Sequence, residues 1–362
     1  MKILCLIESL LPGGAERQMA GLAALLKEKG YEVEVWTYYP QDFYRKQLKD
    51  AGVKYRCILK AQNKLLRIPV LLKEAKRWKP DAVIAYLPTG TMVACMMKLL
   101  GLKAKLIVSE RNTSQQYDRS EKIRFNLFKL AADWVVPNSH MQERFIAEHC
   151  PGLVKKVRVI TNFVDTDYFS PSSEKRIDSK MLRMVCVGRV FPQKNVLSFL
   201  DSLVVLKKRG VQLKVDWFGR IDGEYAEKCL SKVKELELSE IINFRGATKE
   251  IRDEYRKADI FCLPSLWEGF PNVVCEAMSC GLPILCSNVC DNADIVNEGK
   301  NGLLFDPTKV EDIAEKIAKF AAMVSKEQET MSRNCRERAI ELFSKERFIH
   351  QYEELLKKKD EQ

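Results

Sequence analysis

The sequence lacks an apolar run long enough to cross a membrane. Its longest apolar segments have the length of a strand, well short of the roughly 20 residues that a spanning helix needs. The first residues, MKILCLIESLLPGG, also lack the features of a signal peptide, because they carry one lysine, an apolar run interrupted by Glu8 and no small-residue cleavage site. We therefore expect a first strand at this position and no spanning helix.

The cysteines lack the spacing of a metal site. Twelve of them are scattered along 362 residues. The four between residues 275 and 290 come closest to a cluster, but they fall on an expected helix, its end, a strand and a loop. Reduced thiols of a cytoplasmic protein are the expected interpretation.

The chain also lacks the GxGxxG fingerprint of dinucleotide-binding folds, which disfavours NAD. Instead, residues 10–16 form a loop with Gly13 and Gly14, between an expected strand at 2–7 and an expected helix at 17–29. Two glycines at this point let the backbone approach a phosphate closely, although a plain tight turn is the common alternative.

Acidic residues are scarce in the first half of the chain. The net charge is +11, and residues 1–170 account for it with 28 basic and 17 acidic residues, whereas the remainder is neutral. Residues 45–79 carry twelve bases against Asp50 and Glu74, with apolar side chains among them. No nucleic-acid-reading motif accompanies these bases, so we expect no nucleic acid. An anionic membrane surface is the expected partner, and a solvated charged face is the alternative.

Strand-like and helix-like segments alternate along both halves of the chain. Strands are expected at 2–7, 31–38, 82–86, 106–109, 134–137 and 157–160, and then at 184–187, 212–218, 241–244, 260–263, 284–287 and 303–305. This alternation is typical of α/β domains with parallel sheets. A polar stretch, residues 161–180, interrupts it and marks a linker. We therefore expect two Rossmann-like domains, at 1–165 and 166–344.

Residues 259–283, DIFCLPSLWEGFPNVVCEAMSCGLP, hold the strongest functional pattern. A buried strand is expected first, then a loop, then a helix from Val273 to Ser279 with Asn272 as its N-cap. Glu268 on the loop and Glu276 on the helix lie eight positions apart, which is not the spacing of a same-face helical pair. Two carboxylates at one strand end suit a polyhydroxylated ligand, and amides at the helix start suit its phosphate. Solvated glutamates are the alternative.

This stretch resembles the signature of the retaining family 4 glycosyltransferases, two-domain enzymes of the GT-B fold that use nucleotide sugars. Their pattern is Glu-Gly-Phe-Pro, a second Glu eight positions after the first, then Ala-Met and Gly-x-Pro, and every element is present. The resemblance covers nearly the whole chain and is strongest from about 184 to 310. It implies two Rossmann-like domains that face each other across a cleft, with a last helix at about 345–362 that packs on the first.

The resemblance also implies roles for individual residues. Arg189 and Lys194, in the segment GRVFPQKN, would stabilise the leaving diphosphate. Glu268 would orient the donor sugar, and Glu276 would bind the ribose. The other substrate-binding candidates are Gly13, Gly14 and Gly188 near the diphosphate, Phe270, Asn272 and Val273 around the helix start, and Arg245 at the base site. Arg245 has an ordinary surface charge as its alternative.

The family retains the anomeric configuration by same-face substitution, in which the departing phosphate oxygen takes the acceptor proton. Such a mechanism needs no protein nucleophile. Because Arg189 and Lys194 supply the neutralising charge, the resemblance implies no metal and no cofactor besides the nucleotide-sugar substrate. Asp165-Thr166-Asp167 imitates the Asp-x-Asp metal motif of the other large glycosyltransferase fold, but it lies in the stretch that leads into the second domain.

One departure from the family concerns histidine, of which the chain has only three. Many members carry a histidine near the donor sugar, but the matching region, residues 83–90, has none, and His140 is expected to be a cap-region residue. The next loop, Ser-Glu-Arg-Asn, resembles members that extend lipid-linked oligosaccharides. Glu110 and Arg111 in this loop are therefore acceptor-side candidates, with an ion pair at a helix start as the alternative.

The expected activity is retaining transfer of a hexose or N-acetylhexosamine from a nucleotide diphosphate sugar, with UDP as the favoured nucleotide. The expected acceptor is a lipid-linked saccharide in the assembly of a surface glycan such as capsule or lipopolysaccharide. The enzyme would be cytoplasmic and held at the inner face of the membrane through residues 45–79. A sugar-nucleotide epimerase of the same fold and a non-catalytic, membrane-associated partner subunit are the alternatives.

Overall fold

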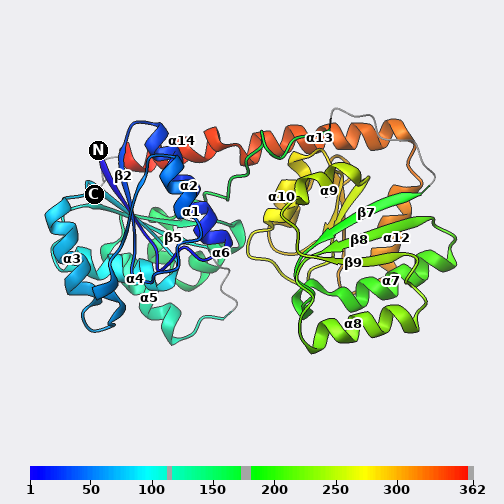
Figure 1. Cartoon of the computed structure of the whole chain (residues 1–362), viewed down its shortest axis with the longest axis horizontal. Coiled ribbons are helices and arrows are strands. Elements are labelled where there is room, and N and C mark those ends of the chain that lie inside the picture. The colour runs from blue at the N-terminus through cyan, green and yellow to red at the C-terminus, as the bar shows by residue number, and fades with distance from the viewer. Residues whose placement is uncertain (112–115, 173–180, 358–362) are drawn as a thin grey trace. The chain divides into compact units, whose positions relative to one another are not determined.

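The computed structural model describes residues 1–111, 116–172 and 181–357 (Figure 1). The chain divides into two compact units, of which unit 1 contains Met1–Phe163 and the segment beginning at Lys345, and unit 2 is Val164–Ser344. The division falls two residues before the boundary expected at 165, and the last helix, α14 (Lys345–Lys357), belongs to unit 1. Within the described residues, no helix has both the length and the apolarity that crossing a membrane requires.

Unit 1 is built on a six-stranded parallel sheet with the order β3-β2-β1-β4-β5-β6. Its strands are β1 (Lys2–Leu6), β2 (Glu32–Thr37), β3 (Lys54–Cys57), β4 (Ala82–Tyr86), β5 (Lys105–Glu110) and β6 (Trp134–Pro137). The helices are α1 (Gly14–Glu28), α2 (Arg45–Asp50), α3 (Arg67–Trp78), α4 (Pro88–Leu99), α5 (Arg119–Ala131) and α6 (His140–His149), with 3-10 turns η1 (Leu59–Gln62) and η2 (Pro151–Lys156).

Both faces of this sheet are buried, so its central strands are apolar throughout. Successive strand residues point to opposite faces. In β1, Ile3 and Cys5 enter one core together with α1, α2 and α14, while Leu4 and Leu6 enter the other together with α3, α4 and α5. Unit 1 therefore has two helical layers, which we call the α1–α2–α14 layer and the α3–α4–α5 layer.

Unit 2 has the same architecture, with the strand order β12-β11-β10-β7-β8-β9. The strands are β7 (Leu182–Val187), β8 (Leu213–Phe218), β9 (Ile242–Gly246), β10 (Ile260–Leu263), β11 (Ile284–Ser287) and β12 (Gly302–Phe305). The helices are α7 (Val196–Lys208), α8 (Glu224–Glu235), α9 (Ile251–Lys257), α10 (Asn272–Ser279), α11 (Asn292–Ile295), α12 (Val310–Ala321) and α13 (Ser325–Phe343), with a 3-10 turn η3 (Pro192–Lys194).

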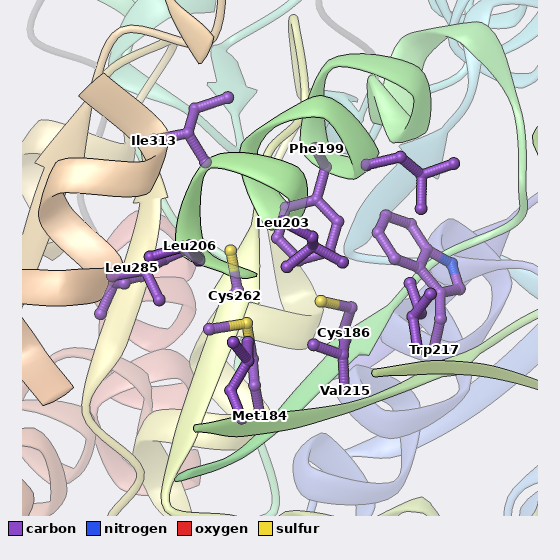
Figure 2. Close-up of a cluster of buried hydrophobic side chains, with 14 of the residues drawn as sticks. Met184, Cys186, Phe199, Leu203, Leu206, Val215, Trp217, Cys262, Leu285 and Ile313 are labelled. Atoms are coloured by element: carbon purple, nitrogen blue, oxygen red, sulfur yellow. The ribbon is translucent and has the colours of Figure 1, made fainter. Parts of the chain in front are cut away.

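Figure 2 shows one of the two cores of unit 2. Phe199, Leu203 and Leu206 of α7 pack over side chains from β7, β8, β10 and β11, and Ile313 of α12 extends the cluster. On the other face of the sheet, α9, α10 and α13 cover a second core that includes Phe261 and Ile284. Two of the cysteines in Figure 2, Cys186 and Cys262, are buried free thiols, and burial raises the pKa of Cys262 well above its ordinary value.

Three local expectations need correction. Residues 157–160 do not form a strand, because only Val157 makes a β-bridge, to Val135. The basic region contains two elements that the sequence did not indicate, α2 and the edge strand β3. Helix α1 begins at Gly14 rather than at residue 17, so the glycine pair lies at the helix start.

The strand order reverses direction at β7 in unit 2, because β8 lies on one side of it and β10 on the other. In open parallel sheets, ligands bind beyond the carboxyl ends of the strands at such a switch point. The loops that follow β7 and β10 meet there, and they contain residues 188–194 and 264–271. The fold of unit 2 alone therefore brings the two strongest sequence motifs to one edge of one sheet.

Candidate functional site

The loop after β7 lies against the loop after β8 with almost no space between their backbones. The Gly188 amide donates to the Phe218 carbonyl at 2.8 Å, and the Trp217 indole Nε1 donates to the Gly188 carbonyl at 2.8 Å. A Cβ on Gly219, whose φ is +148°, would lie 2.1 Å from the Gly188 oxygen. A Cβ on Gly188 would lie 2.9 Å from Lys194 Cε. Close approach of the backbones thus requires glycine at 219, and Gly188 leaves room for the side chain of Lys194.

Lys194 and Glu268 form an ion pair at the switch point. Lys194 Nζ lies 2.5 Å from Glu268 Oε1, and the two side chains are only 15% and 9% exposed. Two further hydrogen bonds join their loops, from the Leu266 amide to the Gln193 carbonyl and from Gln193 Nε2 to the Trp267 carbonyl, both at 2.8 Å. A mostly buried cation and anion are thereby held by a rigid frame at the carboxyl edge of the sheet.

Arg189 lies on the same loop as Lys194 but has a different partner. Its Nε and Nη2 atoms donate to the two carboxylate oxygens of Asp222 at 3.0 and 3.1 Å, and its guanidinium lies over the Phe191 ring. Among the described residues, no hydrogen bond or ion pair joins Arg189 to Lys194, Glu268 or Glu276. The two predicted cations thus share a loop but have different partners, and Arg189 is exposed and paired with Asp222, an acid that no sequence motif indicated.

Glu276 lies on the second turn of α10 and is buried. The Tyr255 hydroxyl donates to its Oε2 at 3.4 Å, a long hydrogen bond, and Tyr255 itself is fully buried. The backbone of Glu268 is also anchored, because its amide donates to Cys290 Sγ at 3.2 Å. Tyr255 and Cys290 contact the two glutamates, and the sequence analysis missed both because neither belongs to the motif.

The start of α10 differs by one residue from the expectation. Pro271 is the N-cap, so Asn272, expected at that position, is the first helical residue. The Asn272 amide donates to the Phe270 carbonyl at 2.9 Å, which leaves the Val273 amide as the better candidate for a phosphate at this helix start. Phe270 is buried in the core, and its ring centroid lies 6.0 Å from that of Phe343. Its side chain therefore anchors the loop to the core of unit 2.

Arg245 projects from β9 and is exposed. Its Nε donates to Asp216 Oδ1 on the neighbouring strand at 2.6 Å, so its charge is paired on the surface of the sheet. Gly246 is tied more closely to the site, because the Gly219 amide donates to its carbonyl at 2.9 Å. The end of β9 therefore borders the site, while the Arg245 side chain is engaged on the sheet surface.

The glycine pair of unit 1 lies beside a carboxylate. Gly13 is the N-cap of α1, and the Tyr44 hydroxyl donates to its carbonyl at 3.2 Å. A Cβ on Gly13 would lie 2.2 Å from Glu16 Oε2, so the Glu16 carboxylate folds over Gly13 at the start of the helix. Burial raises the pKa of Glu16. A phosphate that approached Gly13 and Gly14 would have to displace this carboxylate.

Glu110 and Arg111 are both buried, and they pair with other residues rather than with each other. Arg124 Nη2 donates to Glu110 Oε2 at 2.8 Å, and burial raises the pKa of Glu110 to about 7. Arg111 donates to Asn162 Oδ1 at 3.0 Å and to the hydroxyls of Tyr86 and Tyr352 at 2.6 and 2.5 Å. Because Tyr352 belongs to α14, Arg111 ties the last helix to the rest of unit 1, and its acceptor-side role stays a prediction.

His140 is the first residue of α6 and is exposed. Its Nδ1 lies 3.0 Å from Glu143 Oε2, and the preceding residue, Ser139, caps the helix by accepting from the Gln142 amide. This is the cap-region position expected for it. In the part of the chain that the structure describes, no group of three or more histidine, cysteine, aspartate or glutamate side chains could hold a metal ion.

A pocket of 530 Å³ lies next to the site, beyond the carboxyl ends of β11 and β12. Leu266 forms one wall, and the loop containing Asp306 and Thr308 forms the opposite wall. Lys194 and Glu268 do not line it. This pocket is therefore a neighbour of the Lys194–Glu268 pair and does not contain it.

Two family models match successive parts of the chain. The model described as Glycosyltransferase Family 4 matches residues 12–168, and the model described as Glycosyl transferases group 1 matches residues 171–338. The first lies in unit 1 apart from its last five residues, and the second lies within unit 2. Together they span nearly the whole described chain.

Individual proteins show the same likeness. A Campylobacter jejuni α-1,4-N-acetyl-D-galactosaminyltransferase, named for a GalNAc-containing diNAcBac-PP-undecaprenol, is 29% identical over 323 residues, or 84% of each chain. The UDP-Gal:α-D-GlcNAc-diphosphoundecaprenol α-1,3-galactosyltransferase of Escherichia coli is 28% identical over 198 residues, which are 52% of this chain and 51% of that protein.

Solved structures share the fold along the full length. The crystal structure of Anabaena HepE in complex with UDP and glucose aligns with a TM-score of 0.82 at 20% identity, covering 98% of this chain and 99% of that one. The two parallel six-stranded sheets and this likeness confirm the expected α/β fold class of the GT-B type. The chain belongs to the glycosyltransferases, with a family 4 domain followed by a group 1 domain.

Proposed function

We propose that this glycosyltransferase moves a hexose or N-acetylhexosamine from a nucleotide diphosphate sugar, with UDP as the nucleotide, to a lipid-linked saccharide, with retention of configuration. The observation that carries the donor half of the proposal is the Lys194–Glu268 pair at the switch point of unit 2, with Glu276 on the adjoining helix. The acceptor half is supported by relatives whose names specify undecaprenyl diphosphate saccharides. Assembly of a bacterial surface glycan is the setting that fits both halves.

The proposed mechanism begins with exchange of partners at Lys194. A donor diphosphate that enters the site competes with Glu268 for the ammonium, and Glu268 is then released to accept hydrogen bonds from the sugar hydroxyls. Arg189 and Lys194 together offset the charge that grows on the leaving diphosphate as the glycosidic bond breaks. We propose that these two cations act in place of a metal ion, and that Glu276 binds the ribose.

Retention follows in this proposal from attack on the face that the diphosphate leaves. The departing phosphate oxygen accepts the proton of the acceptor hydroxyl, so the proton ends on the nucleotide product and no covalent glycosyl-enzyme forms. The anomeric configuration of the product, measured by NMR, tests this step directly. Unchanged activity after treatment with a chelator is the expected result for metal-independent transfer, and loss of activity that a divalent cation restores would contradict it.

The central experiment compares site variants in one transfer assay. A panel of nucleotide sugars is incubated with a membrane lipid extract, and products are read by mass spectrometry. Lys194→Ala and Glu276→Ala should abolish transfer while the proteins remain folded by circular dichroism. Lys207→Ala, which removes an exposed lysine of α7 paired with Glu237, is the matched control and should keep wild-type turnover. Wild-type turnover in both site variants would remove the assigned roles.

Two measurements separate this function from its alternatives. A time course with donor alone, followed by NMR, shows release or interconversion of the sugar nucleotide if the protein is an epimerase of the same fold. Calorimetry with UDP shows no binding if the protein is a non-catalytic partner subunit. We also propose that the enzyme works in the cytoplasm at the inner face of the membrane, with the basic residues of 45–79 contributing to its attachment.

A further inference from the structure

The basic segment 45–79 does not form one surface. It passes around the β3 edge of the unit 1 sheet, so α2 lies in the α1–α2–α14 layer and α3 lies in the α3–α4–α5 layer. Several of its cations are engaged. Lys54 and Arg56 pair with Glu34 and Glu74, and Arg67 is buried and donates to the Ala61 carbonyl. The segment as a whole cannot therefore lie flat on a membrane, and only one of the two layers can face it.

Charge distinguishes the two layers. Helices α3, α4 and α5 carry nine basic and two acidic residues, whereas α1, α2 and α14 carry eight basic and six acidic residues. The net charge of the first set is +7 and that of the second set is +2. Lys122 and Lys129 of α5 are exposed, and neither forms an ion pair with any described residue. An anionic surface is attracted to the α3–α4–α5 layer over its counterpart.

Exposed apolar side chains also favour the α3–α4–α5 layer as the membrane-facing surface. Ile123 and Leu130 of α5 are 47% and 71% exposed, and Leu99 at the end of α4 is 47% exposed. Helices α1, α2 and α14 expose no large apolar side chain to this degree within the described residues, and Leu11 and Phe43 lie in the loops before α1 and α2. Ile123 and Leu130 are seven positions apart, which places them on one face of α5 with Lys122 and Lys129 as direct neighbours.

The start of this face is hollowed. A pocket of 470 Å³ lies between α4 and α5 and is lined by Met92, Asp118, Arg119, Ser120 and Ile123. The two helices follow β4 and β5, and a Lys98–Asp133 ion pair joins their far ends, so they run side by side in the same direction. The apolar face therefore extends from this pocket at the starts of the helices to Leu99 and Leu130 at their ends.

We infer that the α3–α4–α5 layer of unit 1 docks on an anionic lipid bilayer, with Ile123 and Leu130 of α5 inserted among the acyl chains and the lysines of α5 at the level of the phosphates. Basic residues beside an apolar stripe are the pattern of interfacial helices, whose binding combines apolar burial with attraction to anionic lipids. This inference deepens the membrane attachment in the proposed function by naming its surface. It places the main contact on α5, outside residues 45–79, and keeps α3 as the part of that segment that shares the layer.

Vesicle sedimentation of the full chain tests the inference without any substrate. Wild-type protein should bind vesicles of phosphatidylcholine with phosphatidylglycerol and bind pure phosphatidylcholine vesicles weakly. The double variant Ile123→Ser with Leu130→Ser should lose at least about tenfold in affinity for the anionic vesicles. The matched control replaces two exposed apolar residues of unit 2, Leu230→Ser with Ile340→Ser, and should bind as the wild type does.

A second pair of variants keeps the test decisive if serine substitution disturbs the fold. Leu130→Trp should gain fluorescence that brominated acyl chains quench in anionic vesicles, while Leu230→Trp should not. Lys46→Glu with Lys49→Glu, which reverses charge on α2, should change vesicle binding less than Lys122→Glu with Lys129→Glu on α5. Two outcomes would overturn the inference. One is wild-type binding by the Ile123/Leu130 serine variant together with no quenching of the indole added by Leu130→Trp. The other is a larger effect of the α2 variant than of the α5 variant.

Failure of this inference is distinguishable from failure of the proposed function. UDP calorimetry and transfer to a water-soluble acceptor analogue report on the site residues, and they need no vesicle. If the proposed function is wrong but the docking surface is right, vesicle binding depends on α5 while UDP does not bind. If only the docking surface is wrong, transfer to the soluble analogue persists and vesicle binding is unaffected by the α5 variants.

Discussion

Lys194 and Glu268 are 74 residues apart in the chain, and their side chains meet at 2.5 Å with little exposure to solvent. A buried ion pair contributes little net stability, because desolvation of both charges opposes their attraction, but loss of one partner leaves an uncompensated charge. The pair therefore indicates function more than stability. In the proposed mechanism, the donor diphosphate replaces Glu268 as the partner of Lys194, and the sugar hydroxyls replace Lys194 as the partner of Glu268.

A double-mutant cycle at this pair separates its two roles. Lys194→Met should destabilise unit 2 by about 2–3 kcal/mol, because Glu268 loses its partner in a mostly buried position, and it should lower kcat by about two orders of magnitude or more. Adding Glu268→Gln should restore most of the free energy of unfolding and none of the activity. Urea unfolding and the transfer assay measure the two effects. Recovery of activity in the double variant would contradict a direct role for Lys194.

Replacement of Gly219 tests the close approach of the loops after β7 and β8. In Gly219→Ala, the added Cβ would lie 2.1 Å from the Gly188 oxygen, so the segment that carries Arg189 and Lys194 must shift. We expect weaker UDP binding and a large loss of transfer. Gly210→Ala is the control, since Gly210 also has a positive φ, +72°, but nothing lies within 4 Å of its added Cβ. It should cost about 1 kcal/mol of stability and leave UDP affinity unchanged.

The structural role of Arg111 predicts an effect on stability without an effect on the acceptor. Arg111→Met removes the hydrogen bonds to Tyr86, Tyr352 and Asn162 and should lower the free energy of unfolding by about 2–3 kcal/mol. Tyr352→Phe should cost about 1 kcal/mol, and faster amide exchange should be confined to α14 and its neighbours. A raised KM for the acceptor in an Arg111 variant of unchanged stability would instead support the acceptor-side role of this residue.

The sequence was most informative where chemistry and local pattern coincide. The order of strands and helices placed Lys194 and Glu268 after two strands, and the reversal of strand order at β7 explains why their loops meet. The position of Arg111 was not predictable in the same way. Its partner Tyr352 is 241 residues away on α14, and a basic residue after a strand has the same sequence pattern whether it faces a ligand or a tyrosine hydroxyl.

The misplaced elements also have physical reasons. Strand β3 was missed because its charged residues mask its alternation, and the structure shows that Lys54 and Arg56 pair with Glu34 on the adjacent strand. The strand expected at 157–160 is apolar enough for a sheet edge, but it makes a single bridge to Val135 beyond β6. Charged residues thus hid a true edge strand, and apolar residues in a loop led to the prediction of a strand that does not form.

Glu110 gives unit 1 a distinctive pH dependence. Burial raises its pKa to about 7 in the folded protein despite the nearby Arg124, whereas an unfolded glutamate titrates near 4.5. Between these values the unfolded chain releases a proton that the folded chain retains, so the free energy of unfolding falls as pH rises, and the loss is complete above about 7. Glu110→Gln removes this dependence. The stability of the wild type relative to Glu110→Gln should therefore fall by about 2–3 kcal/mol between pH 5 and pH 8.

Denaturant unfolding across that pH range, with Glu237→Gln as the control at an exposed carboxylate, measures the dependence. The control should follow the wild type at every pH, because the Glu237 side chain is 86% exposed and its replacement removes no buried charge. Parallel curves for the wild type and Glu110→Gln would contradict this expectation. They would show that Arg124 keeps Glu110 ionised in the folded protein across this pH range, so that its attraction outweighs the effect of burial on the pKa. A curve in which the wild type gains stability with pH relative to Glu110→Gln would reverse the sign and identify the Glu110–Arg124 ion pair as a net stabilising interaction.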